Sequence, residues 1–358
     1  MINKKVTLEQ IINTNCIRYN RLVQMVNSTF AGSEATVVNV YIDLYSIFKP
    51  LYKSNYDMPD YSVITSSVIN LCSHYRRFFN YNYNTYAKFY LVYSRNCPDY
   101  CVGRYRDYNA KNAYMMKVNG FVDDAIMYNL NLLEILCPYL PDIFFVRNTF
   151  ETGVIMYDLI LRNKEANPGE ANIVLTKDSY NFQLASCAPD TVIFRPKKKA
   201  GQDLSYVVNY NNAIEAFVSD RESTKGVRAT YGLSPELLPH VMCLSSVPNR
   251  NIRMVTTITK ALSILHDAVS HYRLQNQYNP NPHVVWRALG ENVTDKLSTT
   301  DNGYTARFYN IDIRNQYLLY YNSAYRNSIQ LLNLSDPNTV QAINNQYFIN
   351  NPLDLQGL

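Results

Sequence analysis

Three acidic residues stand beside apolar segments of the chain, in places where acids can bind a metal ion. Asp43 ends a β-branched run, Glu151 opens a helical segment, and Asp178 follows another apolar run. Mg²⁺ and Mn²⁺ prefer carboxylate oxygens that converge from separate chain segments. The pattern leaves an alternative open, in which Glu151 caps a helix and Asp178 caps a turn. We therefore predict either a single, weakly held Mg²⁺ or Mn²⁺ at these acids, or no cofactor.

Short apolar segments alternate with helical segments through the first part of the chain. The expected strands cover 36–42, 87–93, 142–146, 171–175 and 191–194, and the expected helices include 123–137 and 151–163. Apolar strands that alternate with helices are typical of a parallel sheet covered on both faces. In such a sheet, functional side chains gather at the carboxyl ends of the strands. The pattern predicts an α/β fold in which Asp43, Glu151 and Asp178 meet at one edge of a central parallel sheet.

The composition is that of a folded globular protein. Of the 358 residues, 47% are hydrophobic and 18% are charged, a balance that argues against disorder. No apolar run reaches the roughly 18 residues of a transmembrane helix, and charges interrupt the apolar positions of residues 1–20, which argues against a secretory leader. The seven cysteines are scattered and odd in number, as expected for reduced thiols. We expect an intracellular protein that is not secreted and has no membrane partner.

The charge and the tyrosine content bear on partners and source. The net charge is +5, and this mild basicity is compatible with nucleic-acid binding. Tyrosine is abundant, with 32 residues against 11 glycines, and an AT-rich genome such as that of a phage or another virus would produce this excess. We therefore expect a phage or viral source and a location in the host cytoplasm or with the virion. The expected partners are a DNA or RNA backbone or other viral proteins.

Five segments resemble, in order, sequence blocks of the 5′–3′ exonucleases and flap endonucleases, a family with a PIN-like fold. Residues 40–43 (VYID) resemble the first acidic strand, and 105–111 (YRDYNAK) resemble the entry to the helical arch. Residues 150–155 (FETGVI) match the block xEADDxI, and 176–184 (TKDSYNFQL) match SxDxDxxQL. Residues 232–261 resemble the approach to, and the body of, the helix–three-turn–helix motif. The resemblance implies a PIN-like central parallel sheet flanked by helices, nucleic-acid binding and an ancestry in metal-dependent 5′ nucleases.

Most acids that bind metal in this family are replaced here. Asp43, Glu151 and Asp178 match family acids. The positions where other family acids would stand read Ser94, Gly153, Val154, Tyr180, Val247 and Arg250. Two divalent ions close together need several carboxylates to offset their mutual repulsion. The resemblance therefore implies a catalytically degenerate member.

Basic residues remain in the two regions that contact nucleic acid in the family. They are Arg104, Arg106 and Lys111 in the arch region near 100–120, and Arg250, Arg253 and Lys260 in the helical motif. The arch cations stand among tyrosines, and cations interleaved with aromatic rings suit single strands through charge and stacking. Chance interleaving is the alternative in a tyrosine-rich chain. The glycines of the family's phosphate clamp read Met254, Thr257 and Thr259, so the clamp is weakened or rebuilt with hydroxyls.

The resemblance and the composition predict four parts. They are an N-terminal helix over 1–35, a PIN-like α/β domain over 36–211, a degenerate helix–three-turn–helix region over 212–275 and a C-terminal extension over 276–358. The leading prediction is a pseudoenzyme used for nucleic-acid binding or for assembly with replication or virion proteins. An active metal-dependent 5′ nuclease with a reduced site is the first alternative, and a purely structural viral protein is the second.

Overall fold

A computed structural model describes the sheet and its helices. The described residues are 37–46, 62–94, 120–148, 152–187, 191–195, 198–199, 202–203, 206–221, 232–245 and 256–276. The N-terminal helix expected over 1–35 lies outside these residues, as do the arch region near 100–120 apart from Gly120 and the C-terminal extension apart from Asn276. No helix within the described ranges is long and apolar enough to cross a membrane.

Strands and helices alternate through the first part of the chain. The strands are β1 (Val37–Asp43), β2 (Tyr86–Ser94), β3 (Ile143–Asn148), β4 (Ala171–Leu175), β5 (Thr191–Arg195), β6 (Lys198–Lys199), β7 (Gln202–Asp203) and β8 (Tyr206–Val208). The helices are α4 (Ser62–Tyr83), α7 (Gly120–Leu136), α8 (Thr152–Ala166), α9 (Gln183–Cys187), α10 (Ala213–Arg221), α11 (Leu238–Ser245) and α12 (Ile258–Asn276). The described residues also include four short 3₁₀ helices, which are η1 (Cys137–Tyr139), η2 (Ser179–Phe182), η3 (Tyr210–Asn212) and η4 (Pro235–Leu237).

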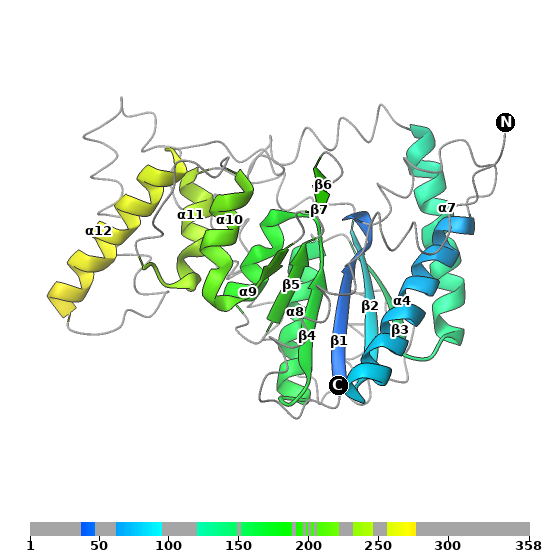
Figure 1. The fold of residues 1–358 in the computed structure, drawn as a ribbon. Coiled ribbons are helices and arrows are strands. Elements are labelled where there is room, and N and C mark those ends of the chain that lie inside the picture. The colour runs from blue at the N-terminus through cyan, green and yellow to red at the C-terminus, as the bar shows by residue number, and fades with distance from the viewer. Residues whose placement is uncertain are drawn as a thin grey trace, which may run out of the picture.

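Six strands form one sheet in the order β3-β2-β1-β4-β5-β8. Strands β1 to β5 pair in parallel, and β8 pairs antiparallel to β5. In Figure 1 the sheet stands in the middle of the molecule, with helices on both sides. This arrangement confirms the predicted fold class, a central and mostly parallel sheet flanked by helices.

Helices bury both faces of the sheet, which is why the strands are apolar throughout. Alternate residues of β1, such as Val40 and Ile42, pack on one face with the apolar side chains of α4 and α7. Tyr41 faces the other way and packs in a cluster with α8 and with α9 to α12. The helices in the region expected over 212–275 thus contribute to the same buried cluster as one face of the sheet. Figure 1 shows α10, α11 and α12 to one side of the sheet.

An aromatic row crosses three strands on the face covered by α8. Tyr41, Tyr90 and Phe144 occupy matched positions of β1, β2 and β3. The rings of Tyr41 and Tyr90 stack with centroids 4.9 Å apart, and those of Tyr90 and Phe144 stack at 5.0 Å. Cross-strand aromatic pairs stabilise a sheet and favour one register. This row therefore helps to align the strand ends that carry the candidate site.

Candidate functional site at the carboxyl edge of the sheet

Two of the three predicted acids lie at adjacent strand ends. Asp43 is the last residue of β1, and Asp178 caps the helix η2 that follows β4. Strands β1 and β4 are parallel neighbours, with Ile42 opposite Leu175. Their carboxyl ends therefore form one edge of the sheet, as the sequence predicts for these two residues.

Internal hydrogen bonds occupy most of the Asp43 carboxylate. Its side chain is buried, with 4% of the residue exposed. Asp43 Oδ2 accepts one hydrogen bond from Ser46 Oγ at 2.6 Å and another from Thr176 Oγ1 at 2.8 Å. Asp43 Oδ1 accepts the backbone N–H of Ser46 at 3.3 Å. An ionised carboxylate offers about four lone-pair positions, so three of them are engaged within the protein.

The two hydroxyls on Asp43 are themselves oriented by donors. Ser46 Oγ accepts the backbone N–H of Lys177 at 3.1 Å. Thr176 Oγ1 accepts the backbone N–H of Asp178 at 3.1 Å and Nδ2 of Asn181 at 2.9 Å. These bonds tie the end of β1 to the loop after β4.

Burial has the largest effect on the pKa of Asp43 at this edge of the sheet. The pKa of Asp43 is raised because desolvation penalises its charged form. The hydrogen bonds from Ser46 and Thr176 act in the opposite direction, and the nearby charge of Asp178 raises the pKa further. The charged form of Asp43 is therefore disfavoured by burial, and the neutral hydroxyls of Ser46 and Thr176 stabilise it.

The space at the start of α8 is filled by Asn181. A Cβ added at Gly153 would clash with Asn181 Oδ1, and it would lie 3.5 Å from Asn181 Cγ and 3.6 Å from Tyr180 Cε1. Asn181 is 1% exposed and Tyr180 is fully buried. Gly153 and Tyr180 are positions where the resemblance places acids. In this chain the Asn181 amide fills the space beside Gly153, and Tyr180 is an aromatic residue of the core.

These residues do not fit a site for two metal ions. Hydroxyl and backbone amide donors occupy most of the acceptor positions of the Asp43 carboxylate. A side chain at position 153 would have no room beside Asn181. Across the described ranges, no three His, Cys, Asp or Glu side chains group so as to hold a metal ion. A carboxylate that bridges two ions through its two oxygens needs a free lone pair on each of them, and Asp43 Oδ2 already accepts two hydrogen bonds, so no metal-dependent step is assigned to it.

The other predicted site residues fall in different places. Lys260 is exposed in the first turn of α12, where its backbone N–H donates to Thr257 Oγ1 at 3.3 Å. The residues outside the described ranges are Glu151, Arg104, Arg106, Lys111, Arg250 and Arg253. For these residues, the metal-binding and nucleic-acid-binding roles stay predictions.

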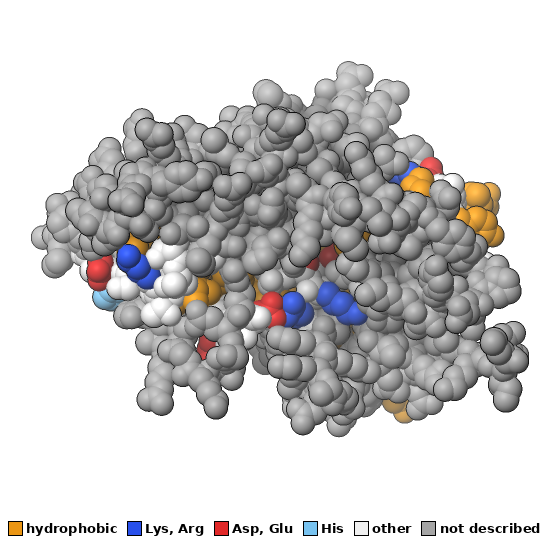
Figure 2. All heavy atoms as spheres, turned by 90° about the horizontal axis from the view of Figure 1, so that it is seen from above, with side chains coloured by type: hydrophobic (Ala, Val, Ile, Leu, Met, Phe, Trp, Pro, Cys, Tyr) orange, Lys and Arg blue, Asp and Glu red, His pale blue; other side chains and the backbone are white. Residues whose placement is uncertain are grey.

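Arg195 is a residue of this region whose role the sequence did not reveal. At the end of β5 it forms an ion pair with Asp220 of α10, and its Nε donates to the backbone oxygen of Lys177 at 3.0 Å. Its guanidinium lies over the Phe182 ring, 5.7 Å from the centroid. Arg195 thus holds the loop that carries Asp178. In Figure 2, which looks down on this edge, basic and acidic side chains lie close together near the middle of the view.

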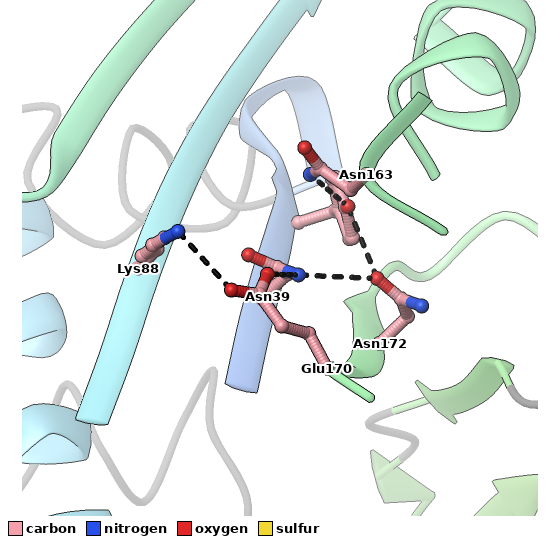
Figure 3. Close-up of polar contacts among 6 residues, drawn as sticks. Asn39, Lys88, Asn163, Glu170 and Asn172 are labelled. Atoms are coloured by element: carbon pink, nitrogen blue, oxygen red, sulfur yellow. Dashed lines mark hydrogen bonds and ion pairs between the residues drawn. The ribbon is translucent and has the colours of Figure 1, made fainter. Parts of the chain in front are cut away.

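A second polar cluster lies toward the amino ends of the same strands (Figure 3). Asn39 Nδ2 donates to Glu170 Oε2 at 2.8 Å, and Lys88 forms an ion pair with Glu170 at 3.3 Å. Tyr41 donates to Asn172 Oδ1 at 3.1 Å and accepts from Asn163 Nδ2 at 2.6 Å. No motif in the sequence indicated this cluster. Asn39 and Asn172 stand opposite each other in β1 and β4, so the cluster favours that register.

Comparisons with known proteins give similarities of low identity. Neither a protein-family model nor a curated protein sequence matches the chain. A structure of the T5 5′-exonuclease with bound zinc shares 11% identity, with a TM-score of 0.46, over 79% of this chain and 99% of that one. A bacteriophage T5 flap endonuclease in complex with DNA and metal ions shares 11% identity, with a TM-score of 0.46, over 78% of this chain and 99% of that one. The catalytic core of Rad2 with a DNA substrate shares 12% identity, with a TM-score of 0.38, over 78% of this chain and 79% of that one.

The fold and the acids at the carboxyl edge of the sheet define the structural class of the protein, but they do not define its activity. The chain is an α/β protein with two acids at adjacent ends of a central parallel sheet. With TM-scores below 0.5, the solved structures add nothing about the activity, metal or ligand of this chain. Membership of the 5′ nuclease family therefore stays a prediction from the sequence blocks.

Gly153→Ala is expected to destabilise the protein, although alanine normally favours helices. The added Cβ would clash with Asn181 Oδ1, which is buried against the start of α8. Overpacking of this kind costs about 1–3 kcal/mol. Urea unfolding of the variant and the wild type measures the loss in the free energy of unfolding.

Gly169→Ala is the matched control, because nothing lies within 4 Å of a Cβ at that position. It should be neutral or slightly stabilising, by about 0.4–1 kcal/mol. Combining Gly153→Ala with Asn181→Ala should recover part of the loss. Equal stabilities for the two glycine variants would show that Asn181 does not close this space.

Proposed function

We propose that this protein is a catalytically degenerate relative of the 5′ nucleases that binds a nucleic-acid backbone without metal-dependent hydrolysis. The observation that carries the proposal is the state of Asp43. Its carboxylate is buried and already accepts three hydrogen bonds from Ser46 and Thr176. A nuclease that uses metal ions needs such a carboxylate to face the ions and the scissile phosphate.

The surroundings of Asp43 support the same proposal. In the sequence resemblance, positions 153 and 180 carry acids, whereas here Gly153 meets the Asn181 amide and Tyr180 packs in the core. Replacing charged ligands with a buried ring and an amide removes the negative charge that two divalent ions require. The aromatic row of the sheet is formed by other residues, so the fold can persist without acids at these two positions.

Binding would rest on cations rather than on metal ions. Lys260 is exposed at the start of α12, and Arg250 and Arg253 stand shortly before it in the sequence. Arginine forms paired, charge-assisted hydrogen bonds to phosphate, so it can contact a backbone directly. Phosphate contacts of this kind give affinity that is largely independent of base sequence.

The purified protein is expected to leave flapped, nicked and single-stranded DNA uncleaved in Mg²⁺ or Mn²⁺. Labelled substrates resolved on denaturing gels measure this directly. The controls are Asp43→Ala and Asp178→Ala, which remove the two acids that meet at the sheet edge. Cleavage by the wild type that vanishes in both variants would instead establish an active nuclease with a reduced site. If the wild type neither cleaves nor retains nucleic acid, the assembly role with replication or virion proteins replaces the binding role.

A further inference from the structure

We infer that Asn181 is the residue that keeps a divalent cation away from the carboxyl edge of the sheet. Its amide orients the Thr176 hydroxyl onto Asp43, and its Oδ1 fills the space that a side chain at position 153 would need. The inference rests on the proposed function, because it takes this edge to work without a metal ion.

The Thr176 hydroxyl has no hydrogen-bonding capacity left. A hydroxyl offers one proton and two lone pairs. Thr176 Oγ1 accepts from the Asp178 N–H at 3.1 Å and from Asn181 Nδ2 at 2.9 Å. Its proton must then point to Asp43 Oδ2, which lies 2.8 Å away. Since an ionised Asp43 only accepts, this chain of bonds also requires the Asn181 NH₂ group to face Thr176.

This orientation is unfavourable for a bound cation. A hard cation beside Asp43 needs lone pairs from the surrounding oxygens. Thr176 turns a proton toward Asp43, and both of its lone pairs are occupied. The NH₂ end of the Asn181 amide adds partial positive charge next to this hydroxyl. Neutral donors therefore stabilise the Asp43 carboxylate where a metal ion would otherwise do so.

Packing holds Asn181 in this role. Its side chain is buried between η2 and the start of α8, and its Oδ1 lies where a Cβ of residue 153 would be. Oδ1 has no hydrogen-bond partner among the described residues. The first turn of a helix carries partial positive charge, which suits a carbonyl oxygen beside Gly153. The amide therefore has its NH₂ toward Thr176 and its oxygen toward α8.

The test is Asn181→Asp, which replaces the amide donor with a carboxylate beside Asp43 and Asp178. Without metal, the variant should melt below the wild type because three carboxylates repel one another. With Mn²⁺ it should recover, by on the order of 5 °C at a hundredfold excess over the dissociation constant. Electron paramagnetic resonance should show one Mn²⁺ bound per chain in the variant and none in the wild type.

Asn181→Ala is the matched control, since it removes the amide without adding a carboxylate. It should lose stability and gain no Mn²⁺ response. If Asn181→Asp does not fold in EDTA, refolding from urea with and without Mn²⁺ replaces the melting experiment. Refolding only with Mn²⁺ supports the inference, and failure in both buffers overturns it.

Two further results would overturn the inference. One is stoichiometric Mn²⁺ binding by the wild type, and the other is a folded Asn181→Asp variant that binds no Mn²⁺. Failure of the proposed function looks different, because the wild type would then cleave DNA in the gel assay or retain no nucleic acid at low salt. A wild type that retains nucleic acid without cleaving it, together with a variant that binds no Mn²⁺, would leave the proposed function standing and reject the role of Asn181.

Discussion

Replacing Arg195 with methionine should lower the free energy of unfolding by about 3–5 kcal/mol, the usual cost of leaving one charge of a buried ion pair alone. The side chains of Arg195 and Asp220 are only 13% and 9% exposed. The variant also loses the hydrogen bond to the Lys177 carbonyl and the contact with the Phe182 ring. Urea unfolding monitored by circular dichroism measures the change.

Arg147→Met is the matched control for the Arg195 substitution. Arg147 forms an ion pair with Glu134 at 3.4 Å, and both side chains are 29% exposed. Partly exposed pairs contribute about 0–1 kcal/mol. Adding Asp220→Asn to Arg195→Met should recover part of the loss, because the lone buried charge is removed. Similar losses for Arg195→Met and Arg147→Met would show that Arg195 does not hold the edge of the sheet.

Nucleic-acid binding should weaken steeply with salt and survive EDTA. Each phosphate that a cation neutralises contributes about −0.9 to the slope of log affinity against log salt. Reversing Arg250 and Arg253 to Glu should weaken binding roughly tenfold or more across sequences alike and make the slope shallower by about 2. Fluorescence anisotropy with labelled single-stranded and duplex DNA over a salt series measures both quantities.

A charge-matched control separates local contacts from net charge. Arg77 is exposed on α4, a helix that packs on the opposite face of the sheet from α12. Arg77→Glu and Arg253→Glu change the net charge equally, so only Arg253→Glu should lower affinity substantially. A wild type that retains neither DNA nor RNA at low salt would reject the binding role.

The strands could be predicted from the sequence because their apolar runs are short and nearly continuous. Side chains buried on both faces leave this local signature, and the five expected parallel strands begin and end within two residues of the observed ones. Parallel order also brings carboxyl ends together, so the meeting of Asp43 and Asp178 followed from their places after β1 and β4. Local pattern and topology were sufficient for this part of the site.

Only the tertiary structure decided what surrounds these acids. Gly153 and Asn181 belong to different elements, and neither residue alone indicates that one fills the space of the other. The pairing of Arg195 with Asp220 likewise joins β5 to α10, so a basic residue at the end of a strand has an internal structural role that the sequence did not indicate. Such contacts depend on how the helices pack on the sheet. That packing produces no periodic pattern in the sequence from which it could be predicted. The sequence by itself determined the sheet and the position of its acids, whereas packing determined that hydroxyls and an amide, and no third acid among the described residues, surround Asp43.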